Sequence, residues 1–300
     1  MSETKQVGSG VVIRNTMTTS VTYVVNLIAS LFLVPYILSK LSIDLYGAFA
    51  LILVIVNYSN LFGGGGAFVK FIAQYHRQDN HKRMNAVANF GLFFYSLQAV
   101  IVAGIMLLFH EPLLRLFAFP ESARPDLPFL LAGVLAISVL RCGLMVYRSA
   151  LFGVQRLDIL AGIQLGGTVL NVVGTIVALE YGCGLHGLVG ISVIAAIYTV
   201  ICQTWAAFRT IPALRFRPFG FTRQTIMETF GYDLKIQVSR IAEMINNEVD
   251  KLLLGGLLSM AAVGFYDLGW KVVPARAPPI APARRQPQQE FDIDYAASAA

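Results

Sequence analysis

Segment 230–257 combines a long apolar run with many ionisable and amide side chains. At about 100° per residue around a helix, the polar residues fall on one broad arc and the aliphatic residues on the other. Ammonium, guanidinium, carboxylate and amide groups on one face predict a wet cavity that binds a charged or hydroxylated ligand. The alternative is support of the helix itself through pairs such as Arg240 with Glu243. The polar arc consists of Lys235, Ser239, Arg240, Glu243, Asn246, Asn247, Asp250 and Lys251.

Segment 15–30 repeats this pattern with uncharged groups, in the stripe Asn15, Thr19, Thr22, Asn26 and Ser30. Hydroxyl and amide groups in such a stripe either bind the hydroxyls of a sugar or hydrogen-bond to a neighbouring helix. We predict that this stripe and the arc of 230–257 face one cavity. From these two segments, the predicted cavity residues are Asn15, Thr19, Thr22, Asn26, Ser239, Arg240, Glu243, Asn247 and Asp250.

Two arginines, Arg141 and Arg148, lie seven residues apart in another apolar run and therefore share a helix face. A guanidinium presents a fork of N–H donors that matches the oxygens of a phosphate. We therefore predict phosphate contacts for Arg141, the deeper of the two, and for Arg240. Arg148 lies near the end of its run, where a basic residue typically fixes orientation. Arg141 has the alternative of pairing with Glu243.

A further polar face in segment 158–180 consists of Gln164, Thr168, Asn171 and Thr175. Small residues such as Gly166 and Gly174 lie beside it, so helix-to-helix hydrogen bonding is the interpretation that we favour there. The Gly63–Gly66 run lacks the strand and the GK[ST] ending of a phosphate-binding loop, and is typical of a helix break.

The elements that must position these groups are membrane helices. Of 300 residues, 56% are apolar and 13% are charged, whereas about 25% are charged in soluble domains. Because a spanning helix needs about 20 mainly apolar residues, the sequence predicts an all-α polytopic membrane protein with about eight transmembrane helices. The predicted spans are 16–38, 45–66, 86–109, 127–149, 158–180, 186–208 and 230–257, with an eighth from about Ala261.

Basic residues are distributed unevenly between the two ends of these spans. Twelve Lys and Arg residues fall on one predicted side and three on the other, which predicts a cytoplasmic N-terminus. The net charge of +6 then reflects orientation in the membrane rather than nucleic-acid binding. The basic side has Lys5, Arg14, Lys70, Arg77, Lys82, Arg83, Arg148, Arg156, Arg209, Arg215, Arg217 and Arg223, and the other has Lys40, Arg115 and Arg124.

An internal repeat with a constant offset relates the start of the chain to its last part. Its pairs are Leu41-Ser42 with Leu258-Ser259, Gly47 with Gly264, Phe49 with Tyr266, and Leu51 with Leu268. Repeated bundles are typical of secondary transporters. We predict a cytoplasmic N-terminus (1–15), a first six-helix bundle (16–208), a basic cytoplasmic linker (209–229), the first part of a second pseudo-symmetric bundle (230–273), and a Pro-, Arg- and Gln-rich disordered tail (274–300) that leaves the second bundle C-terminally truncated.

Signals of catalysis and of cofactor binding are missing from the sequence. It has no HExxH, GxSxG or nucleotide-binding fingerprint. Its three cysteines show no metal-type spacing. The sequence therefore predicts a protein that is not an enzyme and that needs no cofactor and no metal.

The order and spacing of several short motifs resemble the oligosaccharide-lipid flippases, of the O-antigen flippase type, in the multidrug/oligosaccharidyl-lipid/polysaccharide exporter superfamily. The resemblance covers residues 10–272. It rests on Arg14-Asn15, Pro35, Leu41-Ser42, Tyr46-Gly47, Gly63–Gly66, Lys70 to Tyr75, Leu151 to Arg156, Asn171, Gly182 to Gly187, Asp250-Lys251, Leu258-Ser259 and Val263 to Tyr266.

This resemblance implies export of an undecaprenyl-diphosphate-linked oligosaccharide across the bacterial plasma membrane by alternating access, for surface polysaccharide synthesis. The implied partners are the lipid-linked oligosaccharide, membrane lipids and a polysaccharide polymerase or other assembly proteins. One alternative is a cation-coupled multidrug exporter, with Glu243 or Asp250 on the coupling ion. Another is an inactive truncated fragment. A membrane glycosyltransferase or polymerase is disfavoured, because the predicted loops are short and mainly basic.

Overall fold

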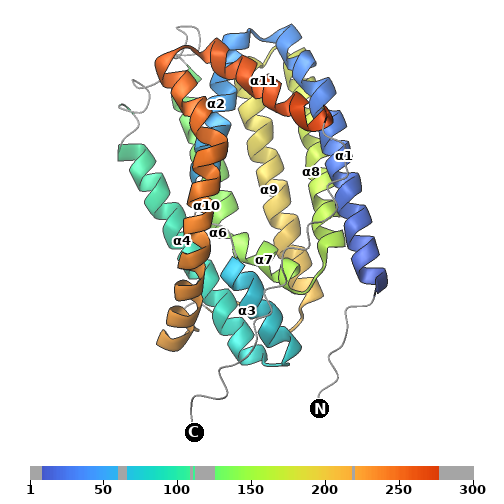
Figure 1. Ribbon diagram of the computed structural model, residues 1–300, viewed down its shortest axis with the longest axis vertical. Helices are drawn as coiled ribbons and strands as arrows, with labels where there is room; N and C mark the ends of the chain where they lie inside the picture. Colours follow the sequence, from blue (N-terminus) through green and yellow to red (C-terminus); the bar gives the residue numbers. More distant parts are fainter. Residues whose placement is uncertain (1–8, 60–65, 109–110, 112–125, 218–219, 277–300) are drawn as a thin grey trace.

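The computed structural model describes residues 9–59, 66–108, 111, 126–217 and 220–276, which form helices and no strand (Figure 1). The predicted all-α class is confirmed. Most of the predicted tail, residues 277–300, lies outside the described residues. The helices are α1 (Ser9–Lys40), α2 (Ile43–Ser59), α3 (Gly66–Arg77), α4 (His81–Leu108), α6 (Leu127–Gly143), α7 (Met145–Gly153), α8 (Leu157–Glu180), α9 (Gly184–Thr210), α10 (Arg223–Leu257) and α11 (Met260–Arg276).

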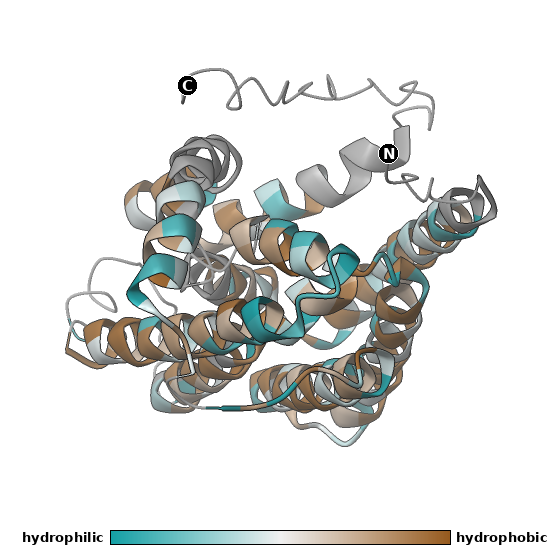
Figure 2. Cartoon of the chain, turned by 90° about the horizontal axis from the view of Figure 1, so that it is seen from below, coloured by the Kyte–Doolittle hydropathy of each residue, from teal (hydrophilic) through white to brown (hydrophobic). Residues whose placement is uncertain are grey.

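The long helices present apolar side chains on their outer faces. Phe32, Leu108 and Trp205 are 77%, 79% and 63% exposed, and Figure 2 shows hydrophobic residues along the length of the helices. Such faces are stable against lipid, and a helix satisfies its own backbone hydrogen bonds there. The protein is therefore a multi-pass membrane protein. Five described segments are long and apolar enough to cross a membrane: Arg14–Lys40, His81–Leu108, Pro128–Gly153, Leu157–Glu180 and Gly184–Thr210.

One predicted span, and one segment between spans, differ from the helices that form. For the second span, the structure describes α2 from Ile43 to Ser59, and most of the Gly63–Gly66 run lies outside the described residues. A helix, α3, forms between the second and third predicted spans, where the sequence analysis predicted no helix, because its apolar side chains lie on one face and pack into the core. The fourth span divides into α6 and α7 at Leu144, whose φ of −110° and ψ of 13° interrupt the helix.

The core has a lower part and an upper part, with α3 and α7 at the lower end of Figure 1 and the α1–α2 and α10–α11 turns at the upper end. The lower core joins α3, α4, α7 and α9 through Phe68, Met84, Val87, Leu151 and Ala207. The upper core joins α1, α2, α6 and α9 through Val34, Ile37, Tyr46, Leu130 and Leu188.

The internal repeat is visible in the helix boundaries. Helix α1 ends at Lys40 and α2 begins at Ile43, while α10 ends at Leu257 and α11 begins at Met260. Both pairs of boundaries are separated by the offset that relates Leu41-Ser42 to Leu258-Ser259. The two turns also use the same cap: Ser42 Oγ accepts a hydrogen bond from Leu45 N at 3.4 Å, and Ser259 Oγ accepts one from Ala262 N at 3.2 Å. The α1–α2 and α10–α11 hairpins are therefore structural counterparts.

The linker between α9 and α10 is held against α4 by two asparagines. Asn85 Nδ2 donates to the carbonyl oxygen of Ala213 at 2.8 Å, and Asn85 Oδ1 accepts from Arg215 N at 2.6 Å. Asn89, one turn further along α4, bonds in the same way to Arg215 O at 3.0 Å and Arg217 N at 2.8 Å. Each carboxamide thus pairs with the linker as a backbone peptide would in a sheet.

Candidate functional site: a polar cavity inside the first bundle

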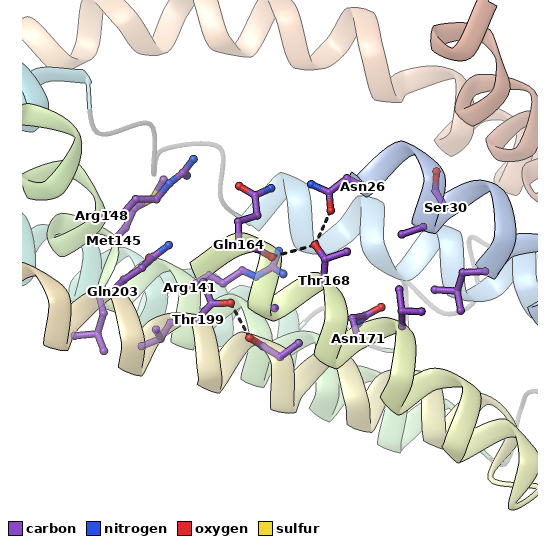
Figure 3. Close-up of a pocket in the computed structure, with 17 residues that line it drawn as sticks. Asn26, Ser30, Arg141, Met145, Arg148, Gln164, Thr168, Asn171, Thr199 and Gln203 are labelled. Atoms are coloured by element: carbon purple, nitrogen blue, oxygen red, sulfur yellow. Dashed lines mark hydrogen bonds between the residues drawn. The ribbon is translucent and has the colours of Figure 1, made fainter. Parts of the chain in front are cut away.

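A cavity of about 590 Å³ lies among α1, α6, α7, α8 and α9, helices of the segment that the sequence analysis predicts to be the first bundle (Figure 3). This volume falls within the range of about 300–1,000 Å³ that is usual for small-molecule sites. Apolar side chains such as Leu33 and Val200 form part of the wall. The polar lining consists of Asn26, Ser30, Arg141, Arg148, Gln164, Thr168, Asn171, Thr199 and Gln203.

Two guanidinium groups supply the positive charge of this cavity. Arg141 lies in the last turn of α6 and Arg148 in α7, and both side chains are exposed although they belong to one candidate membrane span. The helix break at Leu144 lies between them, and Leu144 and Met145 line the same wall. Two forks of donors on one wall are suited to an anion with several oxygens, such as a diphosphate.

The wall formed by α1 and α8 is rich in hydroxyl and amide groups. Thr168 Oγ1 lies 2.5 Å from Asn26 Oδ1 and 3.0 Å from the carbonyl oxygen of Gln164, and its one proton serves one acceptor at a time. Gln164 is exposed to the cavity and Asn171 lies one turn beyond Thr168 (Figure 3). Amides carry both donors and acceptors, so this wall suits a polyhydroxylated ligand.

A second chamber of about 370 Å³ continues the cavity toward the upper end. The two chambers share Arg141, Asn171 and Ser30. The wall of the upper chamber reaches Tyr46 at the start of α2. Arg141 is thus placed where the two chambers join.

The stripe predicted on the first span divides between two environments. Asn26 and Ser30 line the cavity, whereas Asn15, Thr19 and Thr22 do not belong to its described lining. Eleven residues of helix separate Asn15 from Asn26, or about 16 Å. At that distance Asn15 is buried and its Nδ2 donates to the carbonyl oxygen of Gln155 at 3.1 Å. Asn15 therefore ties α1 to the α7–α8 turn.

The hydroxyls of Thr19 and Thr22 bond to carbonyl oxygens of their own helix, at 2.8 Å each. On α10, Ser239, Arg240, Glu243 and Asn247 lie in the helix, but their side chains are outside the described part of the structure. The carboxylate of Asp250 is described, and its Oδ2 accepts a hydrogen bond from the hydroxyl of Tyr266 at 2.6 Å. It is not part of the described cavity lining.

Several lining residues were not predicted as ligand contacts. For Gln164, Thr168 and Asn171 the sequence favours helix-to-helix bonding; Thr168 does bond to Asn26 of α1, and all three residues also line the cavity. Thr199 and Gln203 of α9 were not singled out. Their signal was present in the sequence, because Ser192, Thr199 and Gln203 are spaced by seven and four residues and share one helix face.

Comparison with known proteins agrees with this architecture. Residues 37–280 match the model of a family described as polysaccharide biosynthesis protein. The chain therefore belongs to the polysaccharide biosynthesis protein family, as its resemblance to the oligosaccharide-lipid flippases indicated. No curated protein sequence matches it.

Its fold is also that of a solved structure described as the inward-facing conformation of a multidrug resistance MATE family transporter of the MOP superfamily. The TM-score is 0.55 and the sequence identity is 14%, with 88% of this chain and 61% of that chain covered. The present chain thus spans less than two thirds of the length of that transporter.

Proposed function

We propose that this chain carries a polyprenyl-diphosphate-linked oligosaccharide, of the undecaprenyl type, across the bacterial plasma membrane for polysaccharide synthesis. The observation that carries the proposal is the placement of Arg141 and Arg148 on one wall of a membrane-embedded cavity. A lipid-linked sugar takes a diphosphate through the apolar core of the bilayer. Guanidinium groups inside the cavity would replace the water that solvates this anion at the membrane surface.

The other groups of the cavity fit the remainder of such a ligand. The amide and hydroxyl side chains of α1, α8 and α9 offer hydrogen bonds to sugar hydroxyls. The polyprenyl chain would stay in the lipid, against the apolar outer faces of the helices. None of the described lining residues is acidic, so this cavity favours an anionic ligand over the coupling cation of a drug exporter.

The transport cycle would be alternating access, in which a second bundle moves against the first. Membership in the polysaccharide biosynthesis protein family and a transporter fold support this mechanism. The described part of the second bundle is α10 and α11. The cavity lies within the first bundle, so ligand binding can be measured separately from the transport cycle.

The test is binding of undecaprenyl diphosphate to the purified chain in lipid nanodiscs, measured by native mass spectrometry. A hydrogen bond to a charged group contributes about 1.5–3 kcal/mol, so Arg141→Gln should weaken binding roughly 10- to 150-fold. The matched control is Arg209→Gln, because Arg209 is also exposed but lies over the ring of Trp205 at the end of α9. Equal affinity of Arg141→Gln and the parent would exclude Arg141 from the site.

Transport itself is tested in proteoliposomes that contain a fluorescent lipid-diphosphate sugar. Dithionite added outside bleaches the probe of the outer leaflet, and flipping exposes the probe of the inner leaflet as well. The expected result is bleaching beyond the level of protein-free liposomes, reduced by Arg141→Gln. Bleaching that equals the protein-free level would contradict transport by this chain, while leaving the binding measurement intact.

A further inference from the structure

A buried ion pair joins the two helices of the second bundle, and a tyrosine of the first bundle bonds to it. Lys251 Nζ of α10 lies 2.9 Å from Asp267 Oδ1 of α11, and the side chains are 11% and 6% exposed. The hydroxyl of Tyr46, in α2, donates to Asp267 Oδ2 at 2.8 Å. Buried charges are stable only when they are paired and hydrogen-bonded.

The three residues lie near the upper end of the molecule, where the wall of the upper chamber meets the second bundle. Tyr46 is in the first turn of α2, and α11 packs along that helix. Tyr46 also forms part of the wall of the upper chamber, which it shares with Arg141. Tyr46 therefore lines the upper chamber and also bonds to the second bundle through its hydroxyl.

The internal repeat does not account for this network. At the offset of the repeat, Asp267 corresponds to Ala50, and Tyr46 corresponds to Val263. Ala50 and Val263 belong to one apolar cluster, together with Ala48, Leu51 and Met260. At the positions of Ala50 and Val263, apolar packing alone therefore holds α2 against α11. At the counterpart positions, Asp267 and Tyr46 add a charge and a hydrogen bond that packing does not require.

The contacts between the bundles at the lower end are of a different kind. There, Lys70 of α3 is exposed and lies 3.8 Å from the ring centroid of Tyr232 in α10, and the hydroxyl of Tyr75 donates to Glu228 Oε2 at 3.4 Å. An exposed cation over a ring contributes only about 0.5–1 kcal/mol, and the hydrogen bond is long, so these contacts hold the helices less firmly than a buried ion pair with a short hydrogen bond. The upper contact is buried and directional, so it fixes one arrangement of α10 and α11 against α2.

We propose that Tyr46, Asp267 and Lys251 form a latch that holds the upper junction between the bundles closed. This inference rests on the proposed transport function, since alternating access requires that the two bundles separate at this end. In the closed state Asp267 satisfies both Lys251 and Tyr46. When the junction opens, water replaces Tyr46 at Asp267, while Lys251 stays paired with Asp267 inside the α10–α11 hairpin. The position of Tyr46 on the cavity wall places the latch within reach of a bound ligand.

The latch is tested by electron paramagnetic resonance distance measurements without ligand, so the result is independent of substrate binding. Spin labels are placed at Tyr181, after α8, and at Leu257, at the end of α10, which are 82% and 79% exposed. The native Cys142, Cys183 and Cys202 are replaced by alanine first. The labels report the separation of the two bundles at the upper end.

Tyr46→Phe and Asp267→Asn should each add a population at longer separation. Loss of a hydrogen bond to a charged group should change the ratio of closed to open molecules roughly tenfold or more. The exchanged pair Lys251→Asp with Asp267→Lys should restore most of the closed population. The matched control is Tyr266→Phe, which removes a tyrosine bond to Asp250 inside the α10–α11 hairpin.

Identical distance distributions in the parent and in Tyr46→Phe would overturn the latch. This variant keeps the ring in the upper core, so it remains informative if Asp267→Asn fails to fold. A distribution that changes equally in Tyr46→Phe and Tyr266→Phe would also overturn it, because the effect would then belong to the hairpin. If the parent protein does not bind undecaprenyl diphosphate, but Tyr46→Phe still adds the population at longer separation, the proposed function alone is refuted.

Discussion

Gly47 and Gly264 face each other across the α2–α11 junction, each at a position where the partner helix leaves no room for a side chain. A Cβ on Gly47 would overlap the carbonyl oxygen of Met260, and the backbone nitrogen of Gly264 would lie 3.2 Å from it. A Cβ on Gly264 would lie 3.0 Å from the carbonyl oxygen of Ile43. The contact is reciprocal, because Ile43 and Met260 are also counterparts at the offset of the repeat.

Such reciprocity is the property of a contact on a two-fold axis, where residue i meets j and the counterpart of j meets the counterpart of i. Here the axis is a pseudo-axis within one chain, and it passes between α2 and α11. The close approach of two helix backbones at glycine is typical of membrane helix pairs, which associate through packing rather than through a hydrophobic driving force.

The first prediction concerns this contact. Gly47→Ala should destabilise the fold by about 1–3 kcal/mol, because the added methyl group meets backbone atoms that cannot rotate away. Helix propensity alone would favour alanine by up to about 1 kcal/mol, so the two effects have opposite signs. Unfolding in mixed detergent should be compared with Gly104→Ala, where nothing lies within 4 Å. A Gly47→Ala protein as stable as the control would show that α2 and α11 separate without cost.

From the sequence, Gly47 and Gly264 are identified as counterparts in the repeat, but neither their contact nor the latch beside it is predicted. The sequence shows these counterparts because the two hairpins need small residues at equivalent positions. The partners of Asp267 cannot be recognised in the sequence, because Tyr46 is 221 residues away and its counterpart in the repeat is an apolar valine. Periodicity predicts the face on which a residue lies, whereas the helix that meets this face depends on the packing of the whole bundle.

The second prediction concerns the charges of the latch. Lys251→Met should destabilise the protein by about 3–5 kcal/mol, because it removes the ammonium group that lies 2.9 Å from the buried carboxylate of Asp267. The triple variant Lys251→Met, Asp267→Leu and Tyr46→Phe should recover most of this loss, since apolar residues of similar size can replace a buried ion pair. The free energies of unfolding of the single and the triple variant are compared by equilibrium unfolding. Equal destabilisation in both would mean that the three residues act through shape and not through charge.

The third prediction concerns the wall of the cavity. Thr168→Val removes the hydroxyl that bonds to Asn26 and should cost about 0.6 kcal/mol, with about 1.7 kcal/mol as the upper bound for such bonds between membrane helices. Thr22→Val is the matched control, because Thr22 bonds to the carbonyl oxygen of Thr18 in its own helix. Steric trapping would measure both. A larger loss of stability in Thr22→Val than in Thr168→Val would mean that the hydrogen bond within α1 stabilises the protein more than the bond between α1 and α8.

The candidate site was predicted from the sequence to a different degree on each helix. Arg141 was identified because a guanidinium within an apolar run needs a polar partner or a cavity. Asn26 and Asn15 belong to one stripe, yet only Asn26 reaches the cavity, since the long α1 passes two different neighbours along its length. The polar residues of α9 are too widely spaced to stand out from an apolar helix by composition.

The fourth prediction concerns the linker between the bundles. Asn85→Ala removes the side-chain donor and acceptor that bond to the linker, so the backbone amide of Arg215 loses the Asn85 oxygen as its acceptor. A net loss of about 1 kcal/mol or more corresponds to roughly 5- to 30-fold faster exchange of that amide. Hydrogen exchange with mass spectrometry can follow the peptide that contains residues 213–217.

The control for the linker experiment is Asn80→Ala, because Asn80 Oδ1 caps α4 by accepting from Arg83 N at 3.1 Å and leaves the linker bonds intact. Unchanged exchange at 213–217 in Asn85→Ala would mean that Asn89 alone holds the linker against α4. If exchange rises as predicted, the linker moves with α4 as far as Arg217.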